Sequence, residues 1–129
     1  MLVSKKGFVL DTSALIAFLA DEKEASEVLK VLPSSRIPFI CLSELYYIVW
    51  NKKDRAEADR IYGIVKSWNL PVLYPNERVI LNAGRIKAVY KLGIADSYIA
   101  ALSMDEGFAL VTKDKDYKII AKEIKIMAL

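Results

Sequence analysis

The sequence predicts a three-layer α/β/α sandwich with a mostly parallel central sheet. Short, continuously apolar runs alternate along the chain with segments of helical periodicity. Strands of this composition are typical of a parallel sheet covered by helices on both faces. The 129 residues, of which 54% are hydrophobic and 27% charged, have the size and composition of one globular domain, which we assign to residues 1–129.

Five short apolar runs are the strand candidates, and helical segments lie between them. The runs are residues 8–10, 37–40, 72–74, 108–111 and 125–129. Apolar residues recur three or four positions apart in the helical segments: Val28, Leu29 and Leu32; Ala58, Ile61, Tyr62, Val65 and Trp68; Val79, Ala83, Ile86 and Tyr90; and Ala95, Tyr98, Ile99 and Leu102. In a sheet of this kind ligands bind beyond the carboxyl ends of the strands.

The composition excludes several kinds of site. The chain has no histidine, which excludes Ser-His-Asp and Cys-His nucleophile systems and imidazole-ligated zinc. The single cysteine, Cys41 in the apolar stretch IPFICL, excludes thiolate zinc and an internal disulfide, and we expect it to be a small core residue. No GxxxxGK or GxGxxG phosphate loop is present. Any catalysis must therefore use carboxylates, hydroxyls, lysines or a hard metal ion.

Carboxylates stand where strands end and helices are expected to begin. Asp11 follows the first strand in VLDTSALIAFL, Glu44 stands at an expected helix start in CLSELYY, and Asp96 follows a glycine break in KLGIADSYIAA. Asp114 and Asp116 follow a strand in LVTKDKDY. A parallel sheet brings such positions together at one edge.

Each carboxylate also has a local explanation. Asp11 and the two hydroxyl residues after it can form a helix-capping cluster. Glu44 can complement a helix dipole, and Asp96 can cap a helix or complement its dipole. Asp114 and Asp116 can form a solvated acidic turn that neighbouring lysines balance.

Taken together, the carboxylates indicate a metal site. Converging carboxylates repel one another, which raises their pKa and costs stability unless a cation compensates. Ligands that are all oxygen favour Mg²⁺ or Mn²⁺. Such ions promote phosphoryl chemistry by lowering the pKa of a bound water and neutralising charge on the phosphate.

These motifs resemble those of the PIN domain, a metal-dependent nuclease fold, and most of all the small single-domain toxins of VapC type. The resemblance runs along nearly the whole chain and rests on VLDTSAL, SELYYIVW, LGIADSYIAAL and LVTKDKDY. The family's acidic quartet falls on Asp11, Glu44, Asp96 and Asp114 without substitution, and the second acid of the last motif falls on Asp116.

The resemblance implies a role for each position. Asp11 and Asp96 are the principal metal ligands, directly or through water, and Asp114 closes the pocket. Asp116 supports the site or reaches a second ion, and Glu44 orients the attacking water or a second ion. The hydroxyl positions beside the family's site fall on Thr12 or Ser13 and on Thr112.

The resemblance further implies the substrate and the partners. It implies hydrolysis of RNA phosphodiester bonds with Mg²⁺ or Mn²⁺, leaving 5′-phosphate and 3′-hydroxyl ends. The net charge of +3 is compatible with RNA without selecting it. VapC-type proteins usually form homodimers and are inhibited by a small antitoxin whose C-terminal segment covers the acidic groove. Candidates for the exposed contact face, or equally for the core, are Leu15, Phe18, Leu19, Tyr46, Tyr47 and Trp50.

Two other enzyme-like classes fit less well, and one alternative remains open. A receiver domain needs paired acids after the first strand, and a haloacid-dehalogenase-like phosphatase needs a second aspartate where Ser13 stands. The open alternative is a PIN-like module that binds RNA or protein without cutting, because an intact quartet is necessary but not sufficient for activity.

The sequence also bears on localisation. Its apolar runs are much shorter than the roughly 20 residues of a membrane-spanning helix, and the start MLVSKKG lacks a signal-peptide apolar region. We therefore expect a cytoplasmic protein without membrane attachment.

Overall fold

A central sheet of five strands organises the computed structural model, which describes residues 7–129. The strands are β1 (Phe8–Leu10), β2 (Ser35–Pro38), β3 (Val72–Leu73), β4 (Ala109–Thr112) and β5 (Ile126–Ala128). They pair in the order β3-β2-β1-β4-β5, and every pairing is parallel. The predicted fold class is confirmed, with a sheet that is wholly parallel. Residues 1–6, from which we expected no signal peptide, lie outside the described residues.

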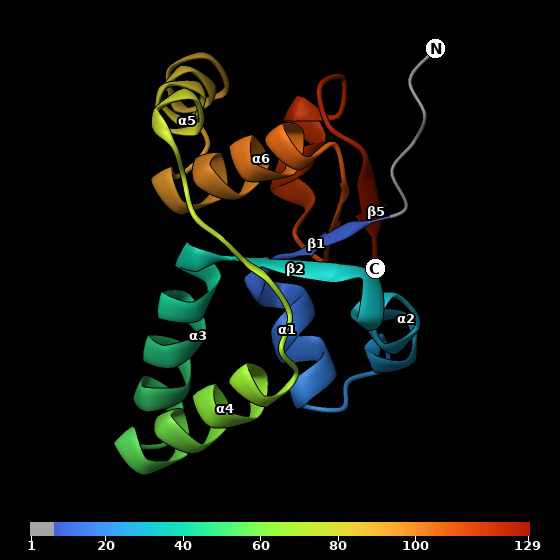
Figure 1. The fold of residues 1–129 in the computed structure, drawn as a ribbon, viewed down its shortest axis with the longest axis vertical. Helices are drawn as coiled ribbons and strands as arrows, with labels where there is room; N and C mark the ends of the chain where they lie inside the picture. The colour runs from blue at the N-terminus through green and yellow to red at the C-terminus, as the bar shows by residue number, and fades with distance from the viewer. Residues whose placement is uncertain (1–6) are drawn as a thin grey trace.

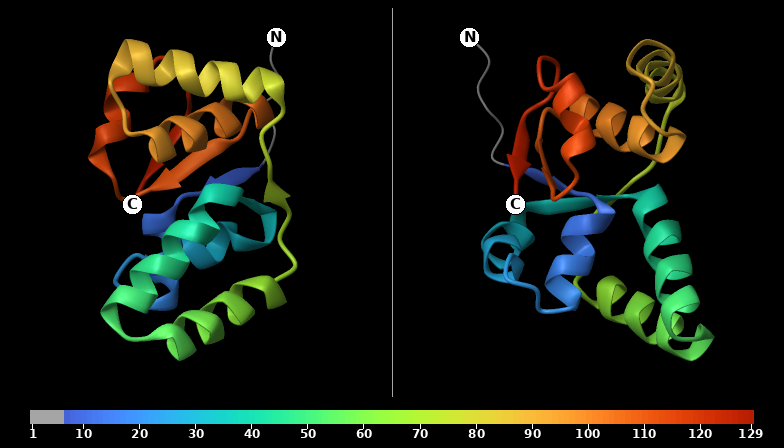
Figure 2. Two further views of the ribbon diagram at one scale, coloured as in Figure 1. Left: turned by 90° about the vertical axis from the view of Figure 1, so that its left-hand side faces the viewer. Right: turned by 180° about the vertical axis from the view of Figure 1, so that it is seen from behind.

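Helices cover both faces of this sheet, as Figure 1 shows and the views of Figure 2 confirm. The helices are α1 (Thr12–Leu19), α2 (Ala25–Val31), α3 (Phe39–Lys52), α4 (Arg55–Ser67), α5 (Glu77–Tyr90) and α6 (Ile94–Glu106), with the 3-10 helices η1 (Leu32–Ser34) and η2 (Lys115–Ile120). The first four α-helices lie on one side of the sheet, and α5 and α6 lie on the other. Within residues 7–129, no helix has the length and apolar character needed to cross a membrane.

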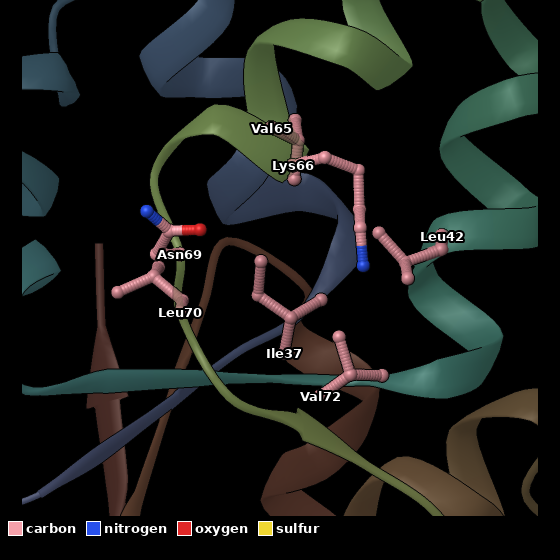
Figure 3. A pocket seen from close by; sticks show the side chains of 7 residues that line it. All are labelled: Ile37, Leu42, Val65, Lys66, Asn69, Leu70 and Val72. Atoms are coloured by element: carbon pink, nitrogen blue, oxygen red, sulfur yellow. The ribbon is translucent and has the colours of Figure 1, made fainter.

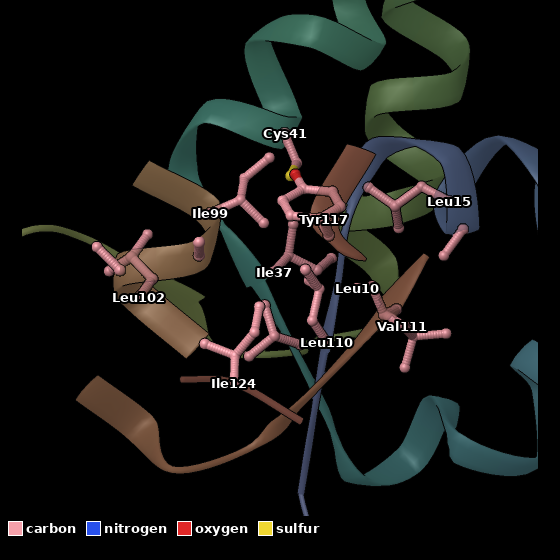
Figure 4. Packing of buried hydrophobic residues seen from close by; sticks show 14 of the residues in the cluster. Leu10, Leu15, Ile37, Cys41, Ile99, Leu102, Leu110, Val111, Tyr117 and Ile124 are labelled. Atoms are coloured by element: carbon pink, nitrogen blue, oxygen red, sulfur yellow. The ribbon is translucent and has the colours of Figure 1, made fainter. Parts of the chain in front are cut away.

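One hydrophobic cluster joins the strands to both helical layers (Figure 4). Strand residues such as Leu10 and Leu110 are fully buried, and Ile99 of α6 packs into the same cluster. Cys41 is buried and unpaired, as expected, and burial raises the pKa of its thiol. Leu15 is also fully buried, so placing it on an exposed contact face was wrong.

The second strand differs from its predicted bounds. We expected a strand over residues 37–40, whereas β2 ends at Pro38 and Phe39 already begins α3. The run IPFICL is apolar because it contains the end of a buried strand and the first turn of a helix that packs against the core. Periodicity cannot separate two such elements in a run this short. The earlier start of α3 moves Glu44 from the expected helix start into the second turn of the helix.

Candidate metal centre

The carboxyl edge of the sheet brings the predicted acids together. Strands β1 and β4 are neighbours, with Leu10 in register with Val111. The next residues, Asp11 just after β1 and Thr112 at the end of β4, therefore lie side by side at this edge. Helix α6 brings Asp96 to the same region. This is seen from Tyr117, in the segment after β4, whose hydroxyl donates to Asp96 Oδ1 at 3.0 Å.

Asp11 is buried, with 4% of its surface exposed, and all its recorded partners are donors. Its Oδ1 accepts from Ser13 Oγ at 2.5 Å and from the Ala14 amide at 3.1 Å, and its Oδ2 accepts from Thr112 Oγ1 at 2.5 Å. Burial raises the pKa of Asp11, and these hydrogen bonds act in the opposite direction. Asp11 is itself the N-cap of α1. The capping explanation is therefore correct for Asp11, and the same carboxylate also lies at the candidate site.

Two hydroxyls connect the exit of β1 with the exit of β4. Ser13 Oγ accepts from the Lys113 amide at 2.9 Å, and Thr112 Oγ1 accepts from the Asp114 amide at 2.9 Å. Since both hydroxyls also donate to Asp11, the backbone that presents Asp114 is fixed relative to the buried aspartate. The predicted hydroxyl positions thus lie directly beside Asp11.

The carboxylates of Asp96, Asp114 and Asp116, here called the acidic trio, each place an oxygen within 4.8 Å of the other two. Asp96 stands in the first turn of α6, where Gly93 is the N-cap and no side chain caps the helix. The capping explanation for Asp96 is therefore wrong, whereas dipole complementation remains compatible. Burial raises the pKa of Asp96, the Tyr117 hydroxyl opposes this, and the charges of Asp114, Asp11 and Asp116 raise it further.

The segment after β4 forms a 3-10 helix that the sequence did not predict. Asp114 has extended backbone and caps η2, its Oδ1 accepting from the Asp116 amide at 2.8 Å. Lys113, which we considered as a balancing charge, instead extends to Glu22 at 2.8 Å and to Glu24 at 3.5 Å. In the part of the chain that the structure describes, no ion pair involves a member of the acidic trio.

Glu44 lies beside the site but outside the acidic trio. Its Oε1 accepts from Thr12 Oγ1 at 2.7 Å, so the first turn of α1 fixes a carboxylate that projects from α3. The first turn of α3 contains no acid, so the explanation of Glu44 as a dipole partner at a helix start was wrong. Thr12 and Ser13 consequently hold different carboxylates, Glu44 and Asp11 respectively.

Sequence reasoning missed Tyr117. This side chain is completely buried, yet its hydroxyl reaches Asp96. The residue follows a stretch read as a solvated turn, and nothing in LVTKDKDY indicates that its last side chain points into the core.

Figure 3 shows a cavity that none of these acids lines. Its volume is about 190 Å³, and it lies between the end of α4 and strands β2 and β3. The residues that line it are Ile37, Leu42, Val65, Lys66, Asn69, Leu70 and Val72. None of them is a predicted site residue, so this cavity is not the acidic site.

The fold and the site together define an α/β protein with a cluster of carboxylates at the carboxyl edge of a parallel sheet. The family model of the PIN domain matches residues 8–123. The chain belongs to the PIN domain family. No curated protein sequence matches it significantly.

Solved structures of low sequence identity share the fold. VapBC-1 from nontypeable Haemophilus influenzae matches with a TM-score of 0.74 and 24% identity, covering 94% of this chain and 96% of that one. VapBC2 from Rickettsia felis, bound to a DNA fragment from its promoter, gives 0.77 and 19%, covering 95% and 98%. VapBC-5 from Mycobacterium tuberculosis, a member of a toxin-antitoxin family, gives 0.73 and 20%, covering 97% and 100%.

Proposed function

We propose that this protein is a metal-dependent endoribonuclease and the toxin of a toxin-antitoxin pair. The observation that carries the proposal is the acidic trio, whose oxygens lie within 4.8 Å of one another without a protein cation among the described residues. Membership of the PIN domain family and the structural likeness to VapBC proteins support the same function.

The donor set fits Mg²⁺ or Mn²⁺. All the candidate ligands are carboxylate oxygens, which hard divalent cations prefer. Burial, and after it the charges of the neighbouring carboxylates, raise the pKa of Asp96, and a cation would relieve the repulsion among these charges. Asp96, Asp114 and Asp116 would hold the ion, and Asp11 would join them directly or through water. When bound, the ion supplies the Lewis acidity that phosphodiester hydrolysis needs.

The chain's own groups have distinct tasks in this proposal. Glu44, fixed by Thr12, orients the attacking water or a second ion. Ser13 and Thr112 keep Asp11 in place through the hydrogen bonds described above. Hydrolysis of an RNA phosphodiester at this site would leave a 5′-phosphate and a 3′-hydroxyl.

A groove between α1, α3 and α4 supports the antitoxin as a partner. Its volume is about 230 Å³, and its lining is largely apolar, including Ile16, Leu19 and Ile48. Lys52 and Lys53 also line it, so a segment with apolar and acidic side chains would be complementary. We propose that a small antitoxin binds along this side of the molecule and that its C-terminal segment covers the acidic groove.

The remaining expectations belong to the same proposal. A homodimer is supported by exposed apolar residues on α5, namely Ile80, Leu81 and Val89. A single PIN-like domain over residues 1–129 is supported by the one core that joins all the layers. A cytoplasmic location is consistent with the buried free thiol of Cys41 in a reducing compartment.

The test is cleavage of a generic single-stranded RNA with Mg²⁺ or Mn²⁺ and with a chelator. We expect cleavage only with metal, and we expect Asp96→Asn to abolish it. Asp105→Asn is the matched control, because Asp105 lies on the same helix and pairs with Arg78 on the surface. Saturable RNA binding without cleavage at any metal concentration would favour the non-catalytic module instead.

A further inference from the structure

Tyr117 joins the hydrophobic core to the acidic trio. It is the largest of the fully buried side chains, and Figure 4 shows its ring within the core cluster. Its hydroxyl donates to Asp96 Oδ1 at 3.0 Å. A side chain held by core packing therefore ends in a donor directly beneath one member of the trio.

The hydroxyl is a donor to Asp96 in this setting. Burial and the nearby charges of Asp11 and Asp96 raise the pKa of Tyr117 well above its ordinary value. A neutral donor beside a carboxylate stabilises the charged form of that carboxylate.

The Asp96 side chain has one donor among residues 7–129, whereas that of Asp11 has three. Asp11 accepts from two hydroxyls and an amide, and Asp114 is fixed as the cap of η2. Among residues 7–129, the bond from Tyr117 is the one recorded hydrogen bond of the Asp96 side chain. Without it, the carboxylate could rotate about its last bond, and its oxygens would lose their fixed orientation toward the trio.

We propose that Tyr117 is a positioning residue, whose hydroxyl fixes the Asp96 carboxylate in the orientation that binds a divalent cation. The inference rests on the proposed metal-dependent function, since it presupposes that the trio binds a cation. Partners that orient metal ligands in this way typically contribute 10- to 100-fold to metal affinity.

Tyr117→Phe tests the inference because it removes the hydroxyl and keeps the buried ring. Mn²⁺ binding to the full chain would be measured from the electron paramagnetic resonance signal of free Mn²⁺. We expect affinity to fall by about tenfold or more, as for other partners of metal ligands. Tyr90→Phe is the matched control, because its hydroxyl also donates to a carboxylate, that of Glu123, away from the trio. We expect it to bind Mn²⁺ as the parent does.

The outcomes separate this inference from the proposed function. Parental affinity in Tyr117→Phe, or an equal loss in Tyr90→Phe, would overturn the positioning role and leave the metal site standing. Loss of the folded state in metal-free Tyr117→Phe, followed by circular dichroism, would assign Tyr117 a structural role and also overturn the inference. Absence of Mn²⁺ binding by the parent would overturn both proposals.

Discussion

Asp96→Asn separates an electrostatic site from a structural one, because the two explanations predict opposite changes in metal-free stability. The substitution removes one charge from the acidic trio and keeps an oxygen that can accept from Tyr117. If the carboxylates repel one another in the absence of a cation, the free energy of unfolding should rise or stay unchanged. If Asp96 mainly stabilises α6, it should fall.

The magnitude follows from the separation of the charges. At 4.8 Å, the limit that bounds the trio, two unit charges repel by roughly 1–3 kcal/mol at effective dielectric constants between about 80 and 20. The partial exposure of the side chains places each pair at the lower end of this range. Loss of the favourable interaction with the α6 dipole costs about 0.3–1 kcal/mol. We therefore expect a net gain of about 1 kcal/mol, which raises the melting temperature by roughly 3–5 °C for a chain of this size.

The assay is thermal unfolding at neutral pH in a chelator, at low and high salt, with Asp105→Asn as the control on the same helix. Salt should reduce the difference between Asp96→Asn and the parent, because it screens the repulsion. Millimolar Mn²⁺ should stabilise the parent through preferential binding to the folded state, and should stabilise Asp96→Asn much less. A loss of more than about 1 kcal/mol in the chelator, the size of a lost helix cap, would refute the reasoning.

The raised pKa of Asp96 determines how metal-free stability changes with pH. Because burial and the neighbouring acids raise the pKa of Asp96, the folded state binds this proton more tightly than the unfolded chain. Metal-free stability should therefore fall as the pH rises from the unfolded pKa of an aspartate through the raised folded pKa. Asp11, whose pKa is raised by burial, contributes with the same sign. Asp96→Asn should make this slope shallower, and an unchanged slope would contradict the origin we assign to it.

Three further outcomes are expected. Asp114→Asn should abolish metal-dependent RNA cleavage, and Asp116→Asn should only weaken it. The reason is that Asp114 stands nearer the strand end and Asp116 is exposed. Equal cleavage rates of the two variants at matched folding and saturating metal would contradict this order. The hydrogen bond from Arg85 lowers the pKa of Glu123. The stability difference between the parent and Glu123→Gln should therefore be present at neutral pH and disappear as the pH falls through the lowered pKa. Melting temperatures measured across pH 3–7 would check this. Leu81→Glu, at a side chain 67% exposed, should convert a dimer into a monomer with an intact fold, and an unchanged sedimentation coefficient would exclude this face.

The sequence predicted the sheet because its strands are apolar without alternation, which is a direct consequence of burial on both faces. The predicted boundary was wrong where strand β2 is followed directly by helix α3. Phe39 begins α3 directly after Pro38, and both residues belong to one apolar run, so the boundary depends on tertiary packing. The sequence left Leu15 open between a contact face and the core, and the fold buries it completely.

The candidate site was predictable to the extent that topology decides it. Residues at the ends of β1 and β4 must lie close together, since these strands are neighbours in the sheet. The contacts that orient each carboxylate were not predictable in this way. They depend on side-chain directions within η2, which turns Tyr117 into the core, and on the pairing of Thr12 with Glu44 across α1 and α3.

The distribution of ion pairs gives the acidic edge its functional character. Several acids elsewhere are paired, among them Glu123 with Arg85, Asp105 with Arg78, and Glu22 with Lys113. Lys113 is adjacent to Asp114 in the sequence, yet it extends away toward α2, and the trio takes no lysine or arginine among residues 7–129. Folding directs Lys113 to Glu22 and Glu24, and neutral donors hold the carboxylates of Asp96 and Asp114. Neutral donors orient a carboxylate and leave its charge available, which is the condition that a cation-binding site requires.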